Sequence, residues 1–155
     1  MQRHVPLSLG WVSLLCLIAC CGCGGSDTHG WSKAEIENAR HFFASTDAHS
    51  RVVAASNRGP TYGVVKPSES RAMDALLKTS LSHARQVSDA VLAKAHPDLP
   101  AHFRGEYQRS IEVLLESSFQ LSGPGIAKQD QALRLHDRWV DWFNANKRSI
   151  RFPKD

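Results

Sequence analysis

The chain has no cysteine after Cys23. All four of its cysteines lie within the first 23 of 155 residues, at Cys16, Cys20, Cys21 and Cys23. A disulfide framework needs cysteines spread along the folded part of a chain. A structural zinc site built on thiolates needs a second ligand pair downstream of the first. The sequence therefore excludes both kinds of scaffold for the residues that follow.

The familiar catalytic motifs are missing as well. No Gly-x-Ser-x-Gly nucleophile elbow occurs in the sequence. Residues 123–125 (Gly-Pro-Gly), followed by Lys128, lack the pattern of a phosphate-binding loop and are typical of a turn between helices. Glu-x-x-His, which di-iron helical bundles use twice, does not occur either. We therefore predict that the protein is not an enzyme and carries no cofactor.

The apolar run over residues 7–18 is too short to cross a membrane. As a helix it spans about 18 Å at about 1.5 Å per residue, well below the hydrocarbon core of about 30 Å. The run follows a short basic start at Arg3 and His4. This order predicts a secretory signal peptide over residues 1–19 rather than a membrane span.

The signal ends in Leu17, Ile18, Ala19 and Cys20. This segment resembles the lipobox of bacterial lipoproteins. The resemblance implies that Cys20 carries diacylglycerol on its sulfur, becomes the first mature residue after cleavage behind Ala19, and receives a further acyl chain such as palmitate on its new amine. Two or three acyl chains hold a protein stably on a bilayer. Cys21 stands where aspartate would resemble an inner-membrane retention signal, so we expect the outer membrane, with the protein facing the periplasm.

A glycine-rich stretch follows the lipobox. Residues 20–30 predict a lipidated cysteine with a flexible tether, whose ten residues after Cys20 reach roughly 16–19 Å. One residue separates Cys21 from Cys23, which strains an internal disulfide. Idle thiols or adventitious pairing are favoured over a functional role for these two cysteines.

The remaining residues, 31–155, predict one helical domain. Apolar residues recur there at steps of three and four, and no run alternates with period two for long enough to make a strand. Four helices are expected, over about residues 32–57, 69–95, 100–122 and 126–147. The short connections favour an antiparallel four-helix bundle.

Some details of these helices can be read locally. Ser32 with Glu35 three residues later forms a capping box, which marks the start of the first helix. Residues 45–47 (Ser-Thr-Asp) are able to cap a second helix, so the sequence leaves open whether the first helix is continuous. The C-terminal tail contains Ile150 and Phe152, and we expect it to fold back on the bundle.

Histidines are the most informative polar residues of the domain. His136 lies near the middle of the apolar arc of the last helix, and His83 lies at the edge of that of the second. His41 and His49 are eight residues apart on the first helix. Half-buried structural histidines are common in bundles, but inward-facing ones also ligate metals. A metal or haem carrier that uses His136 with His49 or His83 is therefore the alternative function.

Two turn-spaced pairs of polar residues lie in the third helix. His102 with Glu106, and Glu112 with Glu116, have a spacing that holds a metal or serves acid–base chemistry. Both pairs lie on the flank or polar side of the helix. We therefore expect a solvated face here rather than a site.

The aromatic residues of the last helix suggest a surface for a partner. Trp139, Trp142 and Phe143 are expected to pack in the core, but Trp142 lies toward the edge of the arc. With Tyr62 it is a candidate binding patch. The leading prediction is a non-enzymatic binding or interaction module of the inhibitor, immunity or assembly-factor type, which meets a protein partner in the cell envelope.

The charge balance of the chain gives a weaker signal. The chain has 19 basic and 15 acidic residues, and export together with this mild excess argues against nucleic acid as a partner. Four basic residues gather at the C-terminus, where they are able to touch anionic lipid headgroups or peptidoglycan. They are Lys147, Arg148, Arg151 and Lys154.

Overall fold

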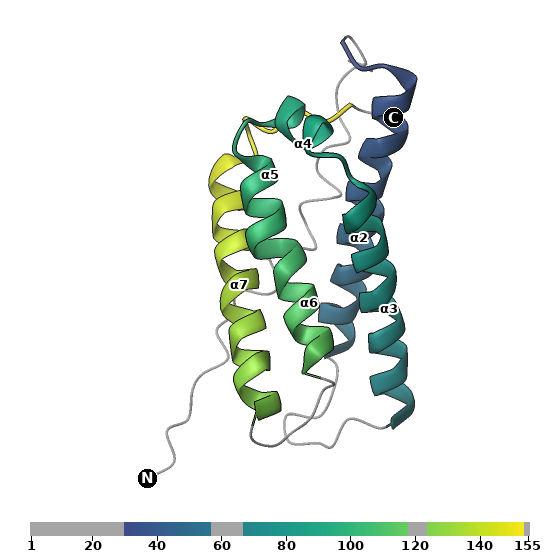
Figure 1. The fold of residues 1–155 in the computed structure, drawn as a ribbon, viewed down its shortest axis with the longest axis vertical. Helices are drawn as coiled ribbons and strands as arrows, with labels where there is room; N and C mark the ends of the chain where they lie inside the picture. Colours follow the sequence, from purple (N-terminus) through teal and green to yellow (C-terminus); the bar gives the residue numbers. More distant parts are fainter. Residues whose placement is uncertain (1–29, 57–66, 118–123, 154–155) are drawn as a thin grey trace.

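The computed structural model describes residues 30–56, 67–117 and 124–153. Within these ranges all regular secondary structure is helical, which confirms the predicted all-α class. The elements are α2 (Lys33–Ser56), α3 (Pro67–Gln86), α4 (Asp89–Ala95), α5 (Leu99–His102), the π-helical segment η2 (Phe103–Gln108), α6 (Arg109–Glu116) and α7 (Pro124–Asn146). Figure 1 shows the long helices side by side, with the short α4 across one end. The predicted signal peptide and lipobox lie outside the described residues.

Helix α2 begins where the sequence predicts and runs without a break. The Ser32 amide donates to Glu35 Oε2 at 2.7 Å, and the Glu35 amide donates to Ser32 Oγ at 3.3 Å, so the predicted capping box is present. Residues 45–47 do not divide the helix. The Thr46 hydroxyl donates back to the carbonyls of Phe42 and Phe43, so it bonds within the helix instead of capping a new one.

The predicted continuous helix over residues 69–95 is wrong. Helix α3 ends at Gln86, and α4 starts at Asp89 with Ser88 as its N-cap, whose hydroxyl accepts from the Val91 amide at 3.2 Å. The Asn38 side chain bridges the break from α2. Its Nδ2 donates to the Gln86 carbonyl and its Oδ1 accepts from the Ser88 amide, both at 2.8 Å. These bonds replace those lost where the helix stops.

The guanidinium of Arg104 also binds the backbone at the break between α3 and α4. Arg104 donates through Nη1 to the Ala84 carbonyl at 2.7 Å, through Nη2 to the Val87 carbonyl, and through Nε to Asp89 Oδ1 at 2.9 Å. Carbonyls at the end of α3 thus find partners that are far away in sequence. The helix break is therefore fixed by tertiary contacts.

The third predicted helix, over residues 100–122, is not a plain α-helix. It is divided into α5, η2 and α6, and residues 118–123 lie outside the described part. Phe103 and Tyr107 of η2 are both buried, with stacked rings whose centroids are 5.0 Å apart. The last predicted helix, 126–147, starts two residues early, because Pro124 is tolerated in a first helical turn.

Aromatic side chains dominate the core at the end where α4 lies. Phe42 is buried, and its ring lies 4.5 Å from that of Phe152, 5.2 Å from that of Phe103 and 6.4 Å from that of Trp139. Phe152 belongs to the tail after α7. The Arg151 amide also donates to the Ala95 carbonyl at 3.0 Å. The expectation that the tail folds back is therefore confirmed.

Candidate functional site

A buried polar centre joins α2, α3 and η2. Ser45 Oγ donates to the Ser80 carbonyl at 2.8 Å, and Ser80 Oγ donates to the Ser45 carbonyl at 2.9 Å. Each serine hydroxyl donates its one proton to a carbonyl, so the Tyr107 hydroxyl, 3.0 Å from Ser45 Oγ and 3.2 Å from Ser80 Oγ, is the donor in these contacts and shares its single proton between the two oxygens. Burial raises the pKa of Tyr107 to about 12, although the bonds to Ser45 and Ser80 oppose this. The phenol therefore stays protonated.

Two histidines lie beside this centre. The His49 ring is 5.4 Å from that of Tyr107 and 4.9 Å from that of His136, in an edge-on contact with the latter. His49 is 6% exposed and His136 is 7% exposed. Burial lowers the pKa of His49 to about 3, with a further contribution from the charge of His136, and burial lowers that of His136 to about 4. Both imidazoles are therefore neutral at pH 7. The burial of His136 agrees with its predicted place on the apolar arc of the last helix.

His83, the third predicted ligand, does not join this pair. It lies on α3 against His41 of α2, with 3.0 Å between their Nδ1 atoms. Among the described residues, no group of three or more His, Cys, Asp or Glu side chains is placed to hold a metal. Haem ligation by His49 and His136 is also disfavoured, because an edge-on ring contact of 4.9 Å leaves no room for a porphyrin between the two rings.

Trp142 is only partly exposed, and two histidines cover it. Its ring stacks on His102 at 4.3 Å and meets His96 edge-on at 5.5 Å. His102 Nδ1 is 3.0 Å from Glu106 Oε2, so this predicted pair does interact, and its side chains are 32% and 20% exposed. Tyr62, the other predicted member of the patch, lies outside the described residues. The pairing of Trp142 with Tyr62 stays a prediction.

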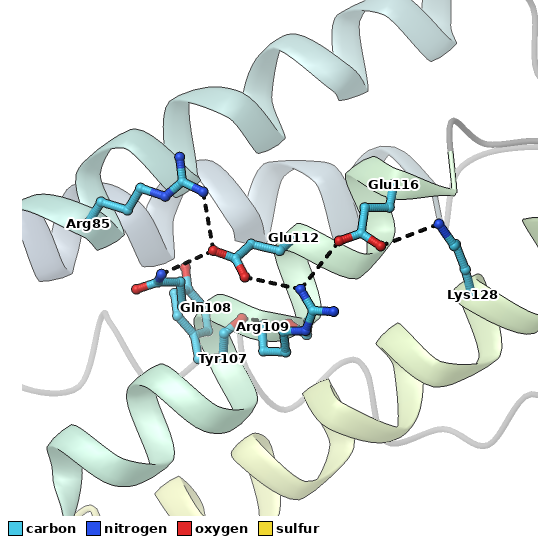
Figure 2. A network of polar contacts seen from close by, with 8 residues as sticks. Arg85, Tyr107, Gln108, Arg109, Glu112, Glu116 and Lys128 are labelled. Atoms are coloured by element: carbon cyan, nitrogen blue, oxygen red, sulfur yellow. Dashed lines mark hydrogen bonds and ion pairs between the residues drawn. The ribbon is translucent and has the colours of Figure 1, made fainter.

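A ladder of charged side chains links α3, α6 and α7 (Figure 2). Glu112 accepts from Arg85 at 3.2 Å and from Arg109 at 3.3 Å; Glu116 accepts from Arg109 and Lys128, each at 3.3 Å. Burial raises the pKa of Glu112, but its hydrogen bonds with Gln108 and the two arginines outweigh this and lower it overall. These pairs are on the surface, where each stabilises by about 1 kcal/mol or less. The ion pairs of Glu112 and Glu116 agree with the prediction that these residues lie on a solvated face of the third helix.

The end of the molecule where α2 begins gathers aromatic and basic residues. Lys94 Nζ bonds both carboxylate oxygens of Glu35 at 2.7 Å and lies 4.8 Å from the centre of the Trp31 ring. The bond from Lys94 is the main cause that lowers the pKa of Glu35 to about 2. Trp31 in turn faces Phe152 of the tail, with 6.4 Å between their rings.

One apolar side chain and three basic side chains are exposed near the end of the molecule where α2 begins. Phe43 is the large apolar side chain that the described residues leave most open, at 41% exposure, and its ring meets that of Phe152 edge-on at 5.3 Å. Lys147, Arg148 and Arg151 are exposed between the end of α7 and the tail. Sequence reasoning singled out the basic cluster but missed Phe43, because it shares the apolar arc of α2 with Phe42.

Comparisons with known proteins do not assign this chain to a family. No family model, no curated protein and no solved structure matches it. Within the described ranges, none of the helices is both long and apolar enough to pass through a bilayer.

Proposed function

We propose that this protein is a bacterial lipoprotein whose antiparallel four-helix bundle is held at the periplasmic face of the outer membrane as a non-enzymatic binding module. The lipobox over residues 17–20 supports the anchor, and the long helices side by side in Figure 1 support the bundle. Its partner is another protein of the cell envelope, and neither nucleic acid nor a cofactor takes part.

One observation carries this proposal. The chain enters α2 from the predicted tether at the same end where the C-terminal tail packs, through Trp31 against Phe152. The exposed cations Lys147, Arg148 and Arg151 belong to that end. A basic residue near an anionic bilayer contributes about 1 kcal/mol of attraction. The tether and these charges therefore favour the same orientation, with this end toward the membrane.

The exposed ring of Phe43, whose edge meets the partly buried Phe152, is the proposed contact surface for the partner. It lies ten residues into α2, about 15 Å along the helix from the end proposed to face the membrane. Contiguous apolar area that a protein leaves exposed commonly marks an interaction site, and aromatic residues dominate binding energy at such sites. By contrast, the buried His49, His136 and Tyr107 are neutral and closed to solvent, so they are unsuited to proton transfer with a substrate.

The test is crosslinking in whole cells with a membrane-permeable reagent, followed by recovery of the lipoprotein from membranes. We expect a discrete adduct with the parent protein, and its loss in the variant Phe43→Ser. Arg138→Ser, which changes an exposed residue on α7, serves as the control and should keep the adduct. An adduct that is equally abundant in Phe43→Ser would contradict the proposed surface, and a protein absent from membranes would contradict the anchor.

A further inference from the structure

His41 and His83 meet at the seam between α2 and α3. Their Nδ1 atoms are 3.0 Å apart, and their ring planes are tilted by 31°. Neither ring is fully buried, so solvent reaches the pair. Two nitrogens at this distance share one proton, because one ring donates N–H while the other accepts with its lone pair. At least one imidazole is therefore neutral and able to act as a ligand.

The separation of the two nitrogens also fits a shared metal ion. Zinc and its neighbours bind imidazole nitrogen at about 2.0–2.1 Å, so two nitrogens around one ion lie about 2.9 Å apart in a square arrangement and about 3.4 Å apart in a tetrahedral one. The observed 3.0 Å is close to the square value. For both Nδ1 atoms to ligate one ion, the proton on the donor Nδ1 moves through water to the Nε2 atom of the same ring, which leaves a lone pair on each Nδ1. A rotation of the two rings then turns these lone pairs toward a common ion on the open side, where water completes the coordination.

We propose that His41 and His83 form a surface site for a divalent first-row transition metal, and that Cu²⁺ binds there most tightly. Cu²⁺ heads the affinity order for nitrogen ligands and prefers the square arrangement that this spacing fits. The two ligands belong to different helices, 42 positions apart in sequence. A bound ion therefore ties α2 to α3 in the folded state alone and raises the midpoint of thermal unfolding.

This site is distinct from the interior histidines and does not depend on the proposed function. His49 and His136 are buried, and His83, the alternative partner predicted for His136, lies against His41 instead. The proposal needs only the two half-buried rings of His41 and His83. Metal binding at this pair therefore requires neither the lipid anchor nor a protein partner.

The experiment is a Cu²⁺ titration of the untagged mature chain in detergent by calorimetry. The parent in this experiment and all variants carry Cys21→Ser and Cys23→Ser, so that these thiols neither bind nor reduce the ion. We expect one equivalent to bind, and a loss of affinity of at least tenfold in His41→Gln and in His83→Gln. His102→Gln is the matched control, because it removes a partly exposed histidine whose polar partner, Glu106, lies on its own helical stretch rather than on a second helix, and it should bind like the parent.

Electron paramagnetic resonance of the parent with one equivalent of Cu²⁺ gives a readout that does not depend on how the variants fold. Hyperfine splitting from two imidazole nitrogens is the expected result, with a rise in the unfolding midpoint that His83→Gln abolishes. Equal affinity in parent and His41→Gln, or a signal from fewer than two nitrogens, would overturn the proposal. Loss of binding in His102→Gln alone would place the ion elsewhere and overturn it as well.

Discussion

The buried pair of His49 and His136 makes stability depend on pH in a defined window. Both pKa values are lowered from 6.5, to about 3 and about 4, because burial disfavours the charged imidazole. The unfolded chain therefore binds protons on these residues below pH 6.5, while the folded chain does not. Stability is fully present above the unfolded pKa and is lost as pH falls toward the folded values.

The magnitude follows from the same two shifts. At pH 5 each histidine lies about 1.5 pH units below its unfolded pKa, so the pair costs about 4 kcal/mol of folding free energy relative to pH 8. That is a large part of the about 5–15 kcal/mol by which domains are stable. Carboxylates with a lowered pKa, such as Glu35 at about 2, make stability depend on pH only in a lower pH range. The window between pH 6.5 and 5 therefore reports on histidines.

The assay is urea unfolding followed by tryptophan fluorescence at several pH values between 8 and 5. We expect the free energy of unfolding of the parent to fall steeply below pH 6.5. His49→Gln and His136→Gln should each reduce that slope by about 1.4 kcal/mol per pH unit. Leu81→Ala, a core change without a titrating group, should lower stability equally at every pH. A parent with the same stability at pH 8 and pH 5, or a double histidine variant that keeps the parent slope, would refute the reasoning.

Three further predictions concern the contacts that shape the fold. Asn38→Ala should lower the free energy of unfolding by about 1–2 kcal/mol, because two backbone groups at the helix break lose their hydrogen-bond partner. The control Asn144→Ala should change it by less than about 0.5 kcal/mol, and urea unfolding measures both variants. Tyr107→Phe should cost about 1 kcal/mol in the same assay, since the serines keep their bonds to the backbone; an unchanged value would mean that the hydroxyl does not stabilise the centre. Phe152→Ala should cost about 2–4 kcal/mol and loosen the tail, measured as faster amide exchange at Arg151; exchange at the parent rate would contradict its packing on the core.

How much the sequence predicts depends on how local each feature is. The capping box of Ser32 and Glu35 could be predicted because both residues lie within one helical turn. The burial of His136 followed from its place on the apolar arc of its own helix. The break after Gln86 could not be predicted, because the groups that satisfy it, Asn38 and Arg104, come from other parts of the chain.

The pairing of side chains between helices was beyond sequence reasoning for the same reason. The alternative function placed His49 or His83 with His136, but the register of α3 against α2 sets His83 beside His41. Ser45 and Ser80 lie within otherwise apolar helix faces. This placement was the one feature of the sequence that indicated a buried polar contact between helices. Which residue on the neighbouring helix receives such a side chain depends on the offset between the helices, which no periodicity encodes.

The central claim is that Cys20 anchors the protein to a membrane, and the intact mass of the mature chain purified from bacterial membranes tests it most directly. The account predicts a chain that begins at Cys20 and carries the mass of a diacylglycerol and one further acyl chain. It also predicts that Cys20→Ala releases the protein from the membrane fraction. A mature N-terminus at any other residue, or a chain from Cys20 without acyl groups, would contradict the claim.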